Sequence, residues 1–295
     1  MLKSDLKASI VIPTYNRAKL LNYTLNSIAN QCIDKRLIEV IIVDDGSTDN
    51  TYSVVNTYKS KMKVRYFFQE DKGYRPGSAR NVGIKNAEGD IIVFVDSGIL
   101  LSSRCVLAHI NAHSSDMHPT VVLGYVYCYD QGNENEDILL KLIAPNSPDK
   151  SIRYFNSTAT FLDLREEYYI KYKDNINDLP APWAYFWTCN VSVSRNFLIK
   201  EVGMFDPKFD GRWGIEDVEL GYRLSEKGAK FKLNRNADSI HYPHTKVETK
   251  KSLEEEINTI YFHKKHQSFE TQLLLSCKPI ELNDMILECA SNKIH

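Results

Sequence analysis

The chain has 295 residues, of which 43% are hydrophobic and 25% charged, and its formal net charge at pH 7 is −1. This length and composition are typical of a globular protein with one large domain or one and a half. The near-neutral charge argues against a nucleic-acid partner, because such proteins usually carry a basic face. The six cysteines are scattered without a C-x-x-C pair, which favours reduced thiols over a disulfide frame.

The sequence contains no hydrophobic segment of the kind that crosses or enters a membrane. No run reaches the ~18 consecutive apolar residues of a membrane span. The first seven residues are polar and lack the apolar core of a signal peptide. We therefore expect a cytoplasmic protein, and peripheral association with the inner face of a membrane stays open.

Predicted strands and helices alternate in the first part of the chain. Apolar runs predict strands at residues 8–13, 38–43 and 63–68, and helices are expected at 18–31 and 50–61. This order is typical of a nucleotide-binding α/β half with a parallel sheet. Asp44 and Asp45 follow the second strand, where they could cap a helix or accept hydrogen bonds from a nucleoside.

A further buried strand, Ile91–Val95, ends abruptly at Asp96. Open α/β sheets bind ligands at the carboxyl ends of their strands, although an Asp can also cap the following helix. The preceding loop, residues 69–77, leads into a helix predicted at 78–87. Arg80 lies near the start of this helix, where it could bind a diphosphate or form a structural salt bridge.

The second part of the chain contains an acidic motif and two histidines. A helix is expected at 100–115 and a strand at 120–129. Residues 130–182 are expected to form a helical insert that serves as a lid or binding segment. The aromatic stretch after it includes Trp183, which could belong to the core or stack on a sugar ring. Further on we expect a helix at 216–228, a strand at 229–233, and a charged helix at 252–272. His241 and His244 lie between the last two of these elements.

Glu216 and Asp217 form an adjacent carboxylate pair at a predicted helix start. One of the two could face a pocket while the other holds structure, or both could simply favour the helix dipole. Trp213 and Gly214 precede them and could bring an indole face and the backbone close to a ligand. No G-x-G-x-x-G follows the first strand and no P-loop motif is present, which disfavours dinucleotide-binding folds and P-loop NTPases.

Five motifs in this order resemble the inverting nucleotide-sugar glycosyltransferases of the GT-A fold, in the large second sequence family. They are VIPTYNR, IVDDGSTD, G-x-ARN, VD and WG-x-ED-x-ELGYRL, found between residues 11 and 224. The similarity is greatest to chondroitin-polymerase-type and galactosaminyltransferase-type domains, and it extends over residues 9–244. The resemblance implies an α/β fold with a mixed, mostly parallel central sheet flanked by helices.

The resemblance also implies a role for each matching residue. Asp217 would be the general base, and Glu216 would support it or hold the acceptor. The uracil and ribose of a UDP-sugar, with its diphosphate, would lie against Pro13, Thr14, Tyr15, Asp44, Asp45 and Arg80. The acceptor side would include Trp183, Asn190, Trp213 and Gly214.

The metal motif departs from the family pattern. Asp96 matches the first carboxylate of the family's D-x-D motif, but Gly98 stands where relatives usually carry a second one. His241, with His244 in reserve, would complete a site for Mn²⁺ or Mg²⁺. The resemblance therefore implies metal-assisted transfer of a hexose or N-acetylhexosamine from a UDP-sugar to a glycan, lipid-linked or peptide acceptor.

Two other functions stay open, and the domain limits follow from the motifs. A non-catalytic relative that binds a nucleotide sugar is favoured by Gly98, and a sugar nucleotidyltransferase shares the α/β scaffold. We expect one domain over 1–250, with a nucleotide-binding half at 8–129, the insert at 130–182 and an acceptor half at 183–245. Residues 251–295 would form a helical appendage. The sequence leaves the sugar, the acceptor and the oligomeric state undetermined.

Overall fold

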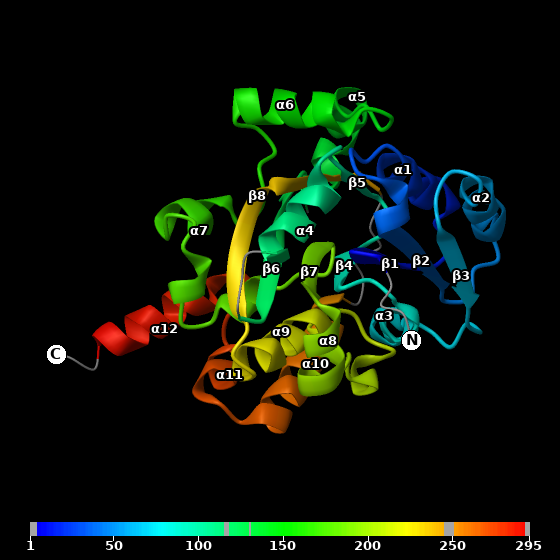
Figure 1. Ribbon diagram of the computed structural model, residues 1–295. Coiled ribbons are helices and arrows are strands. Elements are labelled where there is room, and N and C mark those ends of the chain that lie inside the picture. Colours follow the sequence, from blue (N-terminus) through cyan, green and yellow to red (C-terminus); the bar gives the residue numbers. More distant parts are fainter. Residues whose placement is uncertain (1–4, 115–117, 130, 245–250, 293–295) are drawn as a thin grey trace.

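A mixed sheet forms the centre of the computed structural model, which describes residues 5–114, 118–129, 131–244 and 251–292 (Figure 1). In the described residues the sheet has eight strands in the order β3-β2-β1-β4-β7-β6-β8-β5. The strands are β1 Ala8–Thr14, β2 Ile38–Asp44, β3 Val64–Phe68, β4 Ile91–Val95, β5 Ile99–Leu101, β6 Thr120–Tyr127, β7 Asn190–Ser194 and β8 Lys230–His241.

The strand directions match the predicted mixed, mostly parallel sheet. β1 runs parallel to both β2 and β4, and β2 runs parallel to β3. β6 and β8 form a further parallel pair. β7 is antiparallel to β4 and β6, and β5 is antiparallel to β8. The first four strands are therefore mutually parallel, as their order predicts, and β7 joins them to β6 and β8.

Helices cover both faces of this sheet. One core cluster lies against α1, α2 and α4 and includes Leu25, Tyr58 and Val106. The other lies against α3, α9 and α10 and includes Ile84 and Phe262. The helices are α1 Ala18–Ala29, α2 Thr51–Tyr58, α3 Pro76–Asn86, α4 Cys105–Ser114, α5 Glu136–Leu142, α6 Pro148–Thr158, α7 Glu166–Lys171, α8 Arg195–Phe197, α9 Glu216–Glu226, α10 Lys251–His266, α11 Phe269–Leu273 and α12 Leu282–Ser291.

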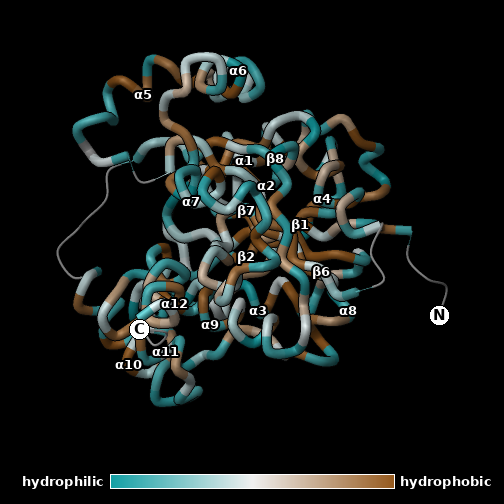
Figure 2. The backbone as a smooth tube through the Cα atoms, turned by 90° about the vertical axis from the view of Figure 1, so that its left-hand side faces the viewer, coloured by the Kyte–Doolittle hydropathy of each residue, from teal (hydrophilic) through white to brown (hydrophobic). Residues whose placement is uncertain are grey.

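The hydropathy of the chain follows these layers. Figure 2 shows the hydrophobic segments, in brown, gathered in the central strands, and hydrophilic segments in the surrounding helices and loops. The strands β2 and β6 are buried along their whole length, which explains why most of their residues are apolar. None of the helices in the described part of the chain is both long enough and apolar enough to span a membrane.

Three predicted elements are wrong in detail. The first two residues of the predicted helix 100–115 belong to β5, Ile99–Leu101, because this segment pairs with the end of β8. β8 is one strand of 12 residues, where the sequence predicts a short strand at 229–233, and the irregularity between Gly124 and Tyr125 of β6 accommodates it. The predicted helix 252–272 is divided into α10 and α11 at Gln267, whose φ is 52°. Residue 130 and residues 245–250, where two domain limits were predicted, lie outside the described residues.

A buried ion pair attaches the insert to the sheet. Arg165 and Asp163 are 1% and 3% exposed, and Nη2 of Arg165 lies 2.7 Å from Oδ2 of Asp163. Arg165 also donates hydrogen bonds to the carbonyl oxygens of Gly124 in β6 and Tyr185. Asp163 accepts one from the backbone N–H of Val126. Two segments that lie far apart in sequence are therefore held together by paired charges that water does not reach.

We predict that Arg165→Met destabilises the protein by about 3–5 kcal/mol, because the substitution leaves the Asp163 carboxylate buried without its partner. Urea unfolding of the wild type and the variant measures the difference. Arg153→Met, at an exposed position of α6, is the control and should change stability by less than about 0.5 kcal/mol. Equal effects of the two substitutions would contradict the proposed role of the ion pair.

Candidate functional site

A buried arginine brings two predicted site residues together. Arg80, in α3, is 3% exposed. Its Nη2 lies 2.8 Å from Oδ1 of Asp96, at the end of β4, and its Nη1 lies 3.1 Å from Oε1 of Glu216, at the start of α9. The side chain of Asp96 is 39% exposed, so one edge of this cluster opens to solvent. Arg80 thus joins the carboxyl end of the central strand to the acidic motif.

Glu216 and Asp217 differ in their surroundings. The side chain of Glu216 is 8% exposed, and burial, followed by the charge of Asp217, raises its pKa above the usual range. Burial also raises the pKa of Asp217. Asp217 accepts hydrogen bonds from the backbone N–H groups of Thr188, at 3.3 Å, and Val218, at 2.8 Å. Among the described residues, Glu216 therefore forms an ion pair with Arg80, whereas the hydrogen bonds of Asp217 come from backbone N–H groups.

The predicted nucleoside-binding carboxylates lie at the end of β2. Asp44 accepts hydrogen bonds from the hydroxyl of Tyr66, at 2.6 Å, and from the backbone N–H of Ser47, at 2.7 Å. Asp45 accepts hydrogen bonds from Arg75 Nη2 at 2.6 Å and from Gln69. Burial raises the pKa of Asp45, although Gln69 and Arg75 oppose the shift.

The loop before α3 contributes two residues that sequence reasoning missed. Arg75 pairs with Asp45, and its side chain is 16% exposed. Tyr74 is 47% exposed as a residue, yet burial of its hydroxyl, followed by the charge of Glu216, raises its pKa. The sequence predicts only a loop at residues 69–77, with no binding role for either residue. Tyr74 and Arg75 directly precede the helix that carries Arg80, and this pattern was the sequence signal for a binding role.

The end of β1 contributes the backbone around Pro13. The carbonyl of Pro13 accepts a hydrogen bond from the hydroxyl of Ser97, and the carbonyl of Thr14 accepts one from the N–H of Asp45. Tyr15 is 46% exposed and donates to Asp71 at 2.8 Å. The predicted nucleotide-binding residues therefore gather at neighbouring strand ends.

Several buried polar atoms of this region have no hydrogen-bond partner among the described residues. Buried polar atoms are normally satisfied, so a group of such atoms indicates a place where a ligand or water binds. Among the described residues, the unsatisfied atoms near the site are Thr14 Oγ1, Arg75 Nε, Arg80 Nε and Glu216 Oε2.

The four residues predicted on the acceptor side are not equivalent. Trp183 is 3% exposed and packs against Tyr222 and Phe262. Asn190 is 1% exposed, and its amide is hydrogen-bonded inside the core to His109 and Ser239. A contact of these two residues with an acceptor stays a prediction, and their packing favours a structural role.

Trp213 and Gly214 lie in the turn before α9 and are both partly exposed. The ammonium of Lys251 lies 5.4 Å from the centre of the Trp213 ring. Gly214 has a φ of 87°, a conformation that favours glycine. These two residues therefore lie next to the acidic pair in a partly open position, and their acceptor contacts stay predictions.

The predicted metal ligands come from two different strands. His241, at the end of β8, pairs with Ile99, three residues beyond Asp96. Its ring lies 5.2 Å from that of Tyr129 and 5.1 Å from that of His244. Within the described ranges no group of three or more His, Cys, Asp or Glu side chains is arranged to hold a metal ion. Ligation by Asp96, His241 or His244 therefore stays a prediction.

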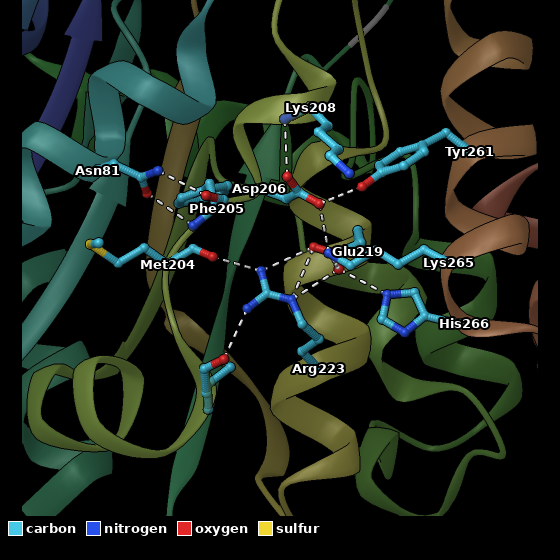
Figure 3. Close-up of polar contacts among 11 residues, drawn as sticks. Asn81, Met204, Phe205, Asp206, Lys208, Glu219, Arg223, Tyr261, Lys265 and His266 are labelled. Carbon is cyan, nitrogen blue, oxygen red and sulfur yellow. Dashed lines mark hydrogen bonds and ion pairs between the residues drawn. The ribbon is translucent and has the colours of Figure 1, made fainter.

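A second polar network fixes the far side of α9 (Figure 3). Glu219 is fully buried and accepts hydrogen bonds from Arg223, at 2.9 Å, and from Lys265, at 2.8 Å. Nε2 of His266 lies 2.9 Å from the same carboxylate. Burial acts to raise the pKa of Glu219, but the contacts with His266, Arg223 and Lys265 outweigh it and lower the pKa to about 2. α9 is thereby tied to α10.

We predict that the stabilising effect of Glu219 depends on pH in the acid range. The folded pKa lies below the usual value, so this stabilisation is present above about pH 4.5 and is lost as the pH falls toward 2. The difference in unfolding free energy between wild type and Glu219→Gln should reach about 3 kcal/mol at pH 6 and shrink by pH 3. Urea unfolding at both values measures it.

Glu226→Gln is the matched control, because Glu226 lies at the exposed end of the same helix. It should change stability little at either pH. A difference between wild type and Glu219→Gln that stays constant from pH 6 to pH 3 would contradict the assigned pKa.

Comparison with known proteins identifies relatives of this chain. The model of the family described as glycosyl transferase family 2 matches residues 9–197. The chain is similar to validoxylamine A glucosyltransferase of Streptomyces hygroscopicus subsp. jinggangensis (strain 5008), with 37% identity over 265 residues, 90% of this chain and 62% of the relative. It is also similar to chondroitin synthase of Pasteurella multocida (strain Pm70), with 31% identity over 246 residues, 81% of this chain and 25% of the relative.

The chain spans about three fifths of the length of the first curated relatives that it matches. The family match contains the first four of the five motifs and extends past β7 to the end of α8 at Phe197. The resemblance expected from the motifs is therefore confirmed.

Solved structures confirm the predicted GT-A fold. S. aureus TarS 1-349 in complex with UDP-GlcNAc superimposes with a TM-score of 0.60 at 19% identity, over 88% of this chain and 66% of that chain. The mannosyltransferase PcManGT from Pyrobaculum calidifontis, in complex with GDP-Man and Mn2+, superimposes with a TM-score of 0.58 at 15% identity, over 97% of this chain and 75% of that chain. At these identities the likeness concerns the fold alone.

Proposed function

Because the chain belongs to glycosyl transferase family 2, we propose that it transfers a hexose or N-acetylhexosamine from a UDP-sugar to an acceptor hydroxyl, with inversion at the anomeric carbon. The observation that carries this proposal is the cluster in which buried Arg80 joins Asp96 to Glu216, beside Asp217. In this cluster the guanidinium can stabilise the charge on a leaving diphosphate, and a carboxylate can take the proton of an acceptor hydroxyl. A single displacement requires both groups.

The donor nucleotide would lie across the ends of β1 and β2. The carboxylates of Asp44 and Asp45 are suited to the N3–H of uracil and the hydroxyls of ribose, since ionised carboxylates only accept hydrogen bonds. Nη2 of Arg75 lies 2.6 Å from Asp45. When the nucleotide base replaces Arg75 at this carboxylate, the guanidinium of Arg75 can pair with the nucleotide. Thr14 and Tyr15 border the same region. TarS was solved with UDP-GlcNAc, which supports a UDP-sugar as donor.

Asp217 would act as the general base. Glu216 is engaged with Arg80, which leaves Asp217 as the carboxylate of the pair that can accept a proton from the acceptor. Its pKa is raised by burial, so its carboxylate is a stronger base than an exposed aspartate. The acceptor oxygen attacks the anomeric carbon, the bond to the diphosphate breaks on the opposite face, and Arg80 stabilises the charge that develops on UDP.

A divalent ion would be held by Asp96 and the donor diphosphate, with His241 as a further ligand. Only one oxygen of Asp96 is engaged by Arg80, and the side chain is 39% exposed, so it can accept an ion. When bound, Mn²⁺ or Mg²⁺ neutralises charge on the leaving diphosphate. With few protein ligands, the ion should bind weakly to the free protein and more tightly with UDP.

We predict that Asp217→Asn keeps UDP binding but lowers the transfer rate by ~10² to 10⁴, because the base is lost while ground-state contacts remain. Calorimetric titration with UDP and measurement of UDP release from UDP-sugars separate the two effects. Glu226→Gln, on the exposed end of α9, should retain the wild-type rate. A rate for Asp217→Asn close to that of the wild type would show that another group is the base.

We also predict that EDTA abolishes activity and that added Mn²⁺ restores it. His241→Ala should raise the Mn²⁺ concentration required for half activity, whereas His118→Ala, at an exposed position, should leave it unchanged. Full activity in EDTA would rule out the metal. An unchanged Mn²⁺ requirement in His241→Ala would remove His241 from the ligand set.

The alternative is a relative that binds a nucleotide sugar without transferring it. Gly98 in place of the second carboxylate favours this alternative, since it reduces the number of metal ligands. A panel of UDP-sugars, with UDP release measured on addition of Mn²⁺, decides between the two. Release from one sugar donor would establish turnover and name the sugar, whereas binding without release would favour the alternative.

A further inference from the structure

The turn that precedes the carboxylate pair has an unfavourable backbone. Gly211, Gly214 and Ile215 have φ values of 84°, 87° and 75°. The left-handed region suits glycine, but isoleucine is branched at Cβ and adopts it only where its surroundings impose it. Ile215 is 3% exposed and directly precedes Glu216. The direction in which Glu216 and Asp217 leave the turn therefore depends on contacts that keep Ile215 in this conformation.

Helix α10 supplies such contacts. Asn258 is fully buried, and its Oδ1 accepts a hydrogen bond from Nε of Arg212 at 2.9 Å. Its Nδ2 donates to the carbonyl oxygen of Gly214 at 2.8 Å. Oε2 of Glu254, one turn earlier in α10, accepts a hydrogen bond from the N–H of Trp213 at 3.0 Å. Arg212, Trp213 and Gly214 are thereby hydrogen-bonded to side chains of α10.

The other end of α10 holds α9 itself. Lys265 donates to both Asp206 and Glu219, at 2.7 and 2.8 Å, and these contacts appear in Figure 3. The neighbouring Lys264 is exposed. α10 therefore contacts the acidic motif at two points: the turn before Glu216 and the first turn of α9, at Glu219. Between these points it packs Phe262 into the core.

We propose that α10 is a positioning element for Glu216 and Asp217, and that Asn258 is its central residue. This proposal rests on the function proposed above. Asn258 touches neither carboxylate, so it acts through the turn. Without its amide, the carbonyl of Gly214 loses its hydrogen bond from Asn258 and Arg212 keeps only its hydrogen bond to the carbonyl of Lys208 among the described residues, so the turn can relax toward the negative φ that Ile215 favours. Glu216 then loses its alignment with Arg80. α10 lies beyond residues 9–197, to which the family model extends.

The test compares two buried asparagines in the full-length protein. Asn258→Asp keeps the acceptor for Arg212 but loses the donor to Gly214. Asn283→Asp, in α12, is the matched control: Asn283 is fully buried and donates to the carbonyl of Ala181 at 3.0 Å, away from the turn. Both variants lose the same type of hydrogen bond, so general destabilisation affects both. Hydrogen–deuterium exchange of residues 211–217 and UDP release from UDP-glucose and UDP-N-acetylglucosamine are measured for each.

We expect Asn258→Asp to speed exchange at residues 211–217 while residues 76–86 exchange as in the wild type. It should lower kcat by about tenfold or more and change KM for the UDP-sugar by less than about twofold, since small misplacements of reacting groups cost that much. Asn283→Asp should change neither exchange at the turn nor kcat.

Unchanged exchange at residues 211–217 in Asn258→Asp would overturn the positioning role, whether or not the protein is active. Faster exchange with an unchanged kcat would overturn the link to the chemistry. Equal losses of kcat in both variants would assign the effect to stability alone and would also overturn the proposal. A wild type that releases no UDP from any UDP-sugar would instead refute the proposed function, and the exchange measurement would still decide the role of Asn258 at the turn.

Discussion

The buried guanidinium of Arg80 is the interaction on which the candidate site depends. A charge removed from water is costly unless it is paired, and Arg80 is paired on both sides, with Asp96 and with Glu216. The three side chains come from α3, from the end of β4 and from the start of α9. Arg80 also allows two carboxylates to approach a common centre, which mutual repulsion would otherwise oppose. Loss of this one cation would leave the carboxylates of Asp96 and Glu216 without their shared partner.

The topology of the sheet decides which side chains meet around this cluster. β1 and β2 run parallel, so Thr14, Asp44 and Asp45 lie at one edge. β7 joins this half to β6 and β8 in the antiparallel direction. The short strand β5 then pairs with the end of β8, and the pairing places His241 opposite Ile99, just beyond the Asp96 turn. Strand order therefore accounts for the positions of Thr14, Asp44, Asp45 and His241, whereas Glu216 and Asp217 are brought in by α9.

The acidic motif is held from both of its sides. Arg80 contacts Glu216 from the sheet, while α10 contacts the preceding turn through Asn258 and the first turn of α9 through Lys265. The strained turn depends on such contacts, since Ile215 itself favours a different conformation. The alignment of Glu216 and Asp217 thus depends partly on α10, which lies outside residues 9–197 of the family match. The same helix contributes Phe262 to the core.

The sequence by itself determined the family, the strand–helix order and the motif residues, because apolar periodicity and short motifs are local properties. The strands that lead to Asp44 and Asp96, and the helix beginning at Glu216, could all be predicted in this way. Tertiary structure alone decided that residues 99–101 form a strand, since only pairing with β8 makes them one. It also decided that Trp183 and Asn190 are buried, that Arg75 pairs with Asp45, and that Asn258 holds the turn. These contacts join residues far apart in the chain, and no local pattern records which distant groups will meet.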